Sequence, residues 1–167
     1  ILEAIYYLAT FTSFHAQNDR QLINFLANQE PLAVTRLVAD FHSRVPGGDR
    51  TRHLEVRLIQ ETNGASGTRL RKEILLDGVK RTVHEAMGAF TSVIFLPQMT
   101  RVIEGGPEER RRYLNLALSQ IIPGYSQALS EYGQALTQRN ALLKQLFERG
   151  GDPEQIVYWD TLLAERG

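Results

Sequence analysis

The feature that most constrains the fold is a strict alternation of residue types over residues 33–42. One set of positions is Ala33, Thr35, Leu37, Ala39 and Phe41, and the set between them is Val34, Arg36, Val38, Asp40 and His42. A period of two puts each set on its own face of a strand, so one face is buried and the other is wet. Turn residues at 46–49 and further apolar runs at 54–58 and 70–76 extend this strand into an antiparallel meander. Asp77-Gly78 then predicts a tight hairpin to a short return strand over 79–81, because glycine accepts positive φ.

Helices are expected on both sides of this meander. Apolar residues at helical spacing over 1–10 predict a helix buried on most sides, without an N-cap. Residues 18–25 predict a short helix capped by Asn18 or Asp19, with Leu22, Ile23 and Phe25 facing inward. The apolar run at 93–96, closed by Pro97, predicts one more strand.

Beyond residue 97 the sequence is helical. Gly106-Pro107 starts a helix whose core stripe is expected to be Leu114, Ala117, Leu118 and Ile121. A long helix with heptad-like spacing follows from residue 125 to Gly150-Gly151, and Asp152-Pro153 caps a last helix over 154–165. The expected fold is therefore mixed α and β: an antiparallel meander with flanking helices over 1–97, then a helical lobe with a long antiparallel helix pair over 98–167.

Composition and motifs exclude several functions. The 19 basic and 19 acidic residues cancel, so any contact with nucleic acid needs a local patch. There is no cysteine, no apolar run of about 18 residues and no basic leader, which argues against disulfides, a membrane span and a secretory signal. The four histidines are scattered and indicate no metal site, and no Gly-x-x-x-x-Gly-Lys-Ser/Thr or Gly-x-Ser-x-Gly motif occurs. No catalytic residue is predicted.

Three segments carry a family resemblance. They are the run over 95–115, which contains Gly105-Gly106-Pro107 and three consecutive arginines, the run over 120–146, and Trp159-Asp160. In this order they resemble the RecF family, and the resemblance extends back to residues 2–5. It implies part of the head of an ABC-type ATPase plus a helical second lobe.

The resemblance also implies a function for the whole protein. RecF family members are cytoplasmic, ATP-dependent DNA-binding proteins of DNA replication, repair, recombination and the SOS response, with no membrane association. They use ATP and Mg²⁺, hydrolyse ATP weakly with DNA, dimerise around the nucleotide, and act with RecO and RecR to load recombinase at single-strand gaps. Family order places Walker A before residue 1 and the signature and Walker B motifs after residue 167. The chain itself is thus expected to be structural, non-catalytic and without a cofactor of its own.

Arg110, Arg111 and Arg112 are the candidates for contact with DNA or phosphate, because guanidinium groups bind phosphate oxygens bidentately. Glu108 lies three and four residues before Arg111 and Arg112, so intrahelical ion pairs explain part of this charge. Arg110 shares the apolar face and is expected to bond loop carbonyls. The structural explanation is favoured.

Other candidates rest on the resemblance. Gln98 lies where such ATPases sense the nucleotide, although Met99 stands where the family pattern has an acidic residue. Thr12 and His15 replace the arginines that flank the Ser-Phe pair in the family, which is expected to weaken phosphate contact there.

Gln138, Arg139 and Asn140 form a polar cluster in the seam of the long helix. Arg139 either fixes the register or the partner choice of this helix, or lays its aliphatic stem across the seam with its charge in solvent, and the second alternative is favoured.

Two other functions remain open at this stage. The chain is alternatively a self-contained, non-catalytic protein-interaction module that binds through the helical hairpin, or a stand-alone DNA binder. A Walker A motif encoded upstream of residue 1 would favour the RecF-like fragment. Salt-dependent DNA binding by the chain alone would favour the stand-alone DNA binder.

Overall fold

The computed structural model describes all residues except 28–29, 46–47, 64–66, 96–100 and 167. The chain forms two compact units, residues 1–123 and 124–167. The boundary expected between residues 97 and 98 lies within the undescribed segment 96–100 and stays a prediction.

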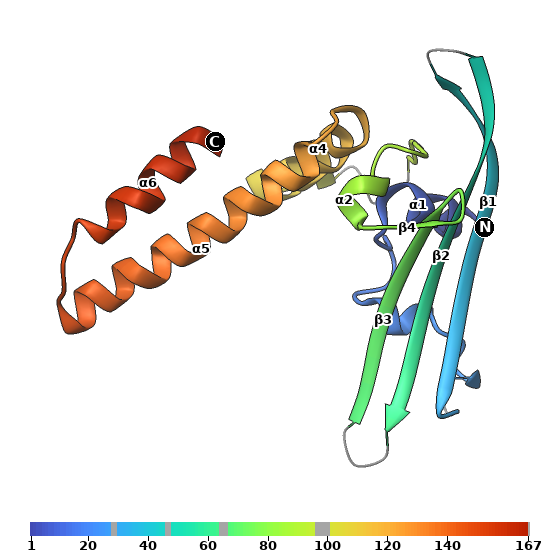
Figure 1. Ribbon diagram of the computed structural model, residues 1–167, viewed down its shortest axis with the longest axis horizontal. Coiled ribbons are helices and arrows are strands. Elements are labelled where there is room, and N and C mark those ends of the chain that lie inside the picture. The colour runs from blue at the N-terminus through green and yellow to red at the C-terminus, as the bar shows by residue number, and fades with distance from the viewer. Residues whose placement is uncertain (28–29, 46–47, 64–66, 96–100, 167) are drawn as a thin grey trace. The chain divides into compact units, whose positions relative to one another are not determined.

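The first unit is built on a four-stranded antiparallel sheet in the order β1-β2-β3-β4 (Figure 1). The strands are β1 (Leu32–Val45), β2 (Gly48–Asn63), β3 (Gly67–Leu76) and β4 (Val79–Arg81). This confirms the predicted meander. The hairpin between β3 and β4 is made by Asp77 and Gly78, whose φ values of 53° and 78° belong to a tight turn of mirror-image type.

One face of the sheet is closed by helix α1 (Leu2–Thr10) and the residue that follows it. Leu54, Val56 and Leu58 of β2 are 0% exposed. They belong to one buried cluster with Tyr7, Leu8 and Phe11. Burying each such aliphatic side chain contributes roughly 1.5–3 kcal/mol, so this contact is a substantial part of the stability of the unit.

The early helical predictions are confirmed only in part. Helix α1 forms, but Leu2 and Ile5 are exposed, so it is not buried on most sides. The second helix is a 3-10 turn, η1 (Asp19–Leu22), which Asn18 caps by accepting a hydrogen bond from the backbone N–H of Arg20. Phe25 is 77% exposed, and its predicted inward position is wrong.

The segment after the sheet contains the short helices α2 (Val83–Ala86) and α3 (Arg101–Glu104) and the longer α4 (Pro107–Ile121). Pro107 begins α4 as predicted. The predicted strand at 93–96 is wrong for residues 93–95, which lie outside any strand, with Val93 and Phe95 largely exposed. The predicted core stripe of α4 is also wrong at Leu114 and Ile121, which are 54% and 69% exposed, because no described element covers them.

Gly88 lets the segment after α2 approach α4. Its φ is +81°, and a Cβ added there would lie 2.7 Å from the carbonyl oxygen of Gln120. The same contact is extended by the side-chain oxygen of Gln120, which accepts a hydrogen bond from the backbone N–H of Ser92. Phe41 of β1 meets Phe90 with ring centroids 5.1 Å apart. These contacts tie the 87–92 segment to both α4 and the sheet.

The second unit consists of α5 (Tyr125–Arg149) and α6 (Gln155–Arg166), which pair antiparallel (Figure 1). Both helices, including the helical position of Trp159, match the prediction. Ala135 is the buried contact of α5. Leu129, Leu136 and Leu143, spaced seven residues apart, are 36–37% exposed, so the apolar arc of α5 is wider than α6 covers.

We expect Gly88→Ala to destabilise the first unit more than Gly78→Ala does. Both positions have φ near +80°, so each substitution costs roughly 1–2 kcal/mol in backbone strain. Only the Gly88 Cβ meets backbone, which adds roughly 1–3 kcal/mol. Urea unfolding of the two variants measures the difference. Equal losses would show that the approach to Gln120 is not tight.

Candidate functional site

A half-buried polar cluster fixes the loop between α1 and η1. The hydroxyl of Tyr7 donates to Asp19 Oδ1 at 2.9 Å, and Lys72 Nζ lies 2.8 Å from Asp19 Oδ2. Lys72 also donates to the carbonyl oxygen of Phe11 at 2.9 Å and lies over the Tyr7 ring. Burial, and then the bond to Asp19, raises the pKa of Tyr7, so this hydroxyl stays protonated. Strand β3 thus holds both ends of the loop.

Within the loop, the side chain of Ser13 organises the backbone. Its hydroxyl donates to Glu3 and accepts hydrogen bonds from the backbone N–H groups of His15 and Ala16. Phe14 packs edge-on against Tyr6, with ring centroids 5.2 Å apart. His15 is exposed in this loop.

The three consecutive arginines at the start of α4 have different environments. Arg110 Nη1 donates to the carbonyl oxygen of Ile103, and Arg111 pairs with Glu108, as the spacing predicts. Arg112 has no acidic partner among the described residues, and its charge acts on Tyr6 of α1. Of the three, Arg112 is the one without a hydrogen-bond or ion-pair partner among the described residues.

The open face of the sheet carries a buried carboxylate between two arginines. Glu55 of β2 is 4% exposed although it points away from α1. Its Oε1 accepts hydrogen bonds from Nε of Arg36 on β1 and, at 2.7 Å, from Nε of Arg57 on β2. These bonds, led by that from Arg36, lower the pKa of Glu55 to about 2.

A second carboxylate on the same face repeats this arrangement. Glu73 of β3, directly opposite Arg57 in the sheet, lies 3.0 Å from Lys80 Nζ and 3.8 Å from Arg71 Nε. The bond from Lys80 is the main cause of its lowered pKa. In both clusters two cations share one carboxylate, and Glu61 near Arg71 and Asp40 near His53 add acidic groups to the same face.

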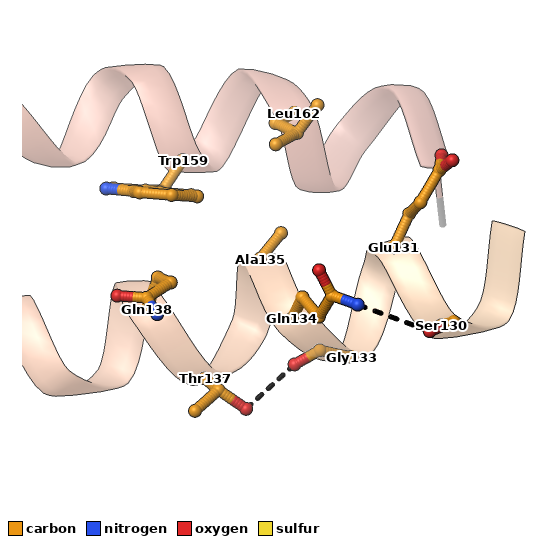
Figure 2. A pocket seen from close by; sticks show the side chains of 9 residues that line it. All are labelled: Ser130, Glu131, Gly133, Gln134, Ala135, Thr137, Gln138, Trp159 and Leu162. Carbon is orange, nitrogen blue, oxygen red and sulfur yellow. Dashed lines mark hydrogen bonds between the residues drawn. The ribbon is translucent and has the colours of Figure 1, made fainter. Parts of the chain in front are cut away.

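The polar cluster predicted on the long helix contacts α6. Arg139 Nε pairs with Asp160 Oδ1, so the structure favours the first alternative, with the charge paired to the adjacent helix rather than in solvent. Gln138 lines a groove of about 580 Å³ between α5 and α6, in which Trp159 and Leu162 face Ala135 (Figure 2). Asn140 is exposed. The remaining lining residues are Ser130, Glu131, Gly133, Gln134 and Thr137, and none of them is cationic.

The candidate nucleotide sensor falls in a segment that the structure does not describe. Gln98 and Met99 lie outside the described residues. Within the described ranges, no three His, Cys, Asp or Glu side chains are placed to hold a metal ion. No helix there is both long and apolar enough to cross a membrane.

Sequence reasoning missed the two carboxylate-centred clusters and the cluster around Lys72. Glu55 and Arg57 are two residues apart on one strand and therefore share a face, which was a usable signal. Arg36 and Glu73 join them only through the register of the strands.

The sheet, its covering helix and the helical pair match those of known proteins. A DNA replication and repair protein RecF from Herpetosiphon aurantiacus is 38% identical over 100% of this chain and 44% of its own length. The RecF protein of Thermomicrobium roseum is 35% identical over 100% of this chain and 41% of its own. No protein-family model matches.

Solved structures of RecF proteins also resemble this chain. Two structures of the recombination mediator protein RecF from the RecFOR pathway, one with ATP and one with an ATP analogue, superpose on 99% of this chain with TM-scores of 0.76 and 0.78 at 29% identity. This chain covers 40% and 41% of those structures. The fold is therefore that of ABC-type ATPase heads with a helical lobe.

Within that class, the chain belongs to the RecF family. It spans about two fifths of the length of the relatives that it matches.

We expect Glu55→Gln to lower the thermal stability of the first unit at pH 7 by roughly 3–6 °C, because two hydrogen bonds to a charged acceptor are weakened. The pKa of Glu55 is depressed in the folded state, so its contribution is complete above its ordinary value of 4.5 and is lost as the pH falls toward about 2. The difference from wild type should shrink over that window. Glu30→Gln, at an exposed site, is the control; a difference for Glu55→Gln that does not depend on pH would contradict the assignment.

We expect Lys72→Met to loosen residues 11–19, because Asp19 and the Phe11 carbonyl lose their shared donor. Amide hydrogen exchange should become faster in this loop and remain unchanged in α5. Lys144→Met removes an exposed lysine and is the control. Unchanged protection of the loop would show that Tyr7 alone holds it.

Proposed function

We propose that the chain is the central part of an ATP-dependent DNA-binding protein that acts with RecO and RecR at single-strand gaps in DNA. The observation that carries this proposal is its likeness to RecF proteins over its whole length. The printed name of those relatives is DNA replication and repair protein, and the matched structures are titled as a recombination mediator with ATP.

In this proposal the chain contributes architecture rather than chemistry. Phosphoryl transfer needs a phosphate loop, Mg²⁺ ligands and a group that orients water, held together. The sequence contains no phosphate-loop motif, so ATP and Mg²⁺ belong to the whole protein. The whole protein would dimerise around the nucleotide and hydrolyse it weakly in the presence of DNA.

Site residues follow from the same proposal. Arg112 is the first candidate for a phosphate of DNA, because Arg110 and Arg111 already have partners. Gln98 remains the candidate nucleotide sensor. The pairing of Arg139 with Asp160 would keep α5 and α6 together as one arm.

The test is binding of gapped DNA by the full-length protein, with and without ATP, over a range of salt concentrations. We expect ATP to strengthen binding, and Arg112→Gln to reduce the slope of log affinity against log salt by about 0.9. Arg50→Gln, at an exposed arginine outside any ion pair among the described residues, is the matched control. Binding that is absent, or that does not respond to ATP, would reject the proposed function.

A further inference from the structure

The open face of the sheet presents cations that are already fixed in place. Arg36 and Arg57 lie directly opposite each other on β1 and β2. Both donate through Nε to the same oxygen of Glu55. A guanidinium held at Nε has a defined plane, so its remaining donors point in a fixed direction.

Those remaining donors are not used within the described part of the chain. The terminal nitrogens of Arg36 and Arg57 make no hydrogen bond there, and the two side chains are 58% and 38% exposed. The carboxylate that fixes them is 6% exposed at its side chain. Glu55 is therefore buried beneath the exposed guanidinium groups of Arg36 and Arg57.

The neighbouring strands extend this arrangement. Glu73 is 17% exposed, whereas its partners Arg71 and Lys80 are 51% and 68% exposed. The two clusters together hold four cations and two carboxylates, and in each cluster the cations are more exposed than the acid that they share. The same face of the sheet also carries two further acids. Glu61 lies 3.8 Å from Arg71, and Asp40 pairs with His53.

Helices α1 and α2 pack on the other face. Tyr7, Leu8 and Phe11 contact the side of the sheet that carries Leu54, Val56 and Leu58. A flat face with fixed, exposed guanidinium groups matches phosphate groups, which guanidinium binds through two parallel hydrogen bonds.

We propose that Arg36 and Arg57, oriented by Glu55 and flanked by Arg71 and Lys80, form a binding surface for the phosphate backbone of nucleic acid. The surface is distinct from Arg112. It rests on the proposed function in taking DNA as the polyanion. Its contacts position the strand and carry no base specificity.

The test uses the full-length protein, a gapped DNA oligonucleotide and a range of salt concentrations. Arg36→Gln combined with Arg57→Gln should reduce the salt slope by about 1.8, the value for two lost phosphate contacts. The Arg36→Lys and Arg57→Lys pair keeps both charges and should restore the slope. A merely structural role for the arginines would not move this slope.

Lys80→Gln is a second variant, because Lys80 is exposed and its loss leaves the Glu55 cluster intact. It should reduce the slope by about 0.9. Arg50→Gln is the charge-matched control and should leave the slope unchanged.

The outcomes separate the two proposals. If the glutamine variants keep the wild-type slope, or if Arg50→Gln lowers it as much as Lys80→Gln, the surface is refuted. In that case ATP-dependent DNA binding by the wild-type protein would still support the proposed function. If the wild-type protein binds no DNA, both proposals fall.

Discussion

The structure of the first unit depends on burial of one face of its sheet. Leu54, Val56 and Leu58 are completely excluded from solvent where they meet α1 and its following residue, and at the edge of this contact Lys72 of β3 donates to the carbonyl oxygen of Phe11. Because side chains alternate along a strand, a shift of register by one residue would turn this apolar set outward. The same constraint therefore determines which residues lie on the open face, and it brings Arg36, Glu55 and Arg57 together there.

Local rules predicted the elements whose cause is local. The Asp77-Gly78 turn requires positive φ at both residues. Proline is favoured in the first turn of a helix, where Pro107 begins α4, and Gly150 ends α5 with a φ of 72°. These requirements involve neighbouring residues only, so the sequence contained them. The alternation over 33–42 predicted its strand for the same reason.

Predictions of burial failed where a distant partner was needed. Leu114, Ile121 and Phe25 lie on apolar faces, but periodicity identifies a face without showing what covers it. The cluster of Tyr7, Asp19 and Lys72 brings together an early helix, a 3-10 turn and a strand. The two carboxylate-centred clusters depend on the register of all four strands. Ion pairs within α4, by contrast, were predictable because Glu108 and Arg111 are one helical turn apart.

The position of Glu55 also determines how the open face responds to its surroundings. A carboxyl group with a pKa of about 2 is ionised throughout the physiological range, and arginine does not lose its proton there. The charge of the cluster formed by Arg36, Glu55 and Arg57 is therefore constant over this range of pH. Salt screens the electrostatic interactions of this cluster, with a Debye length of about 8 Å at 0.15 M salt. Salt would therefore release a partner held by the charge of this cluster.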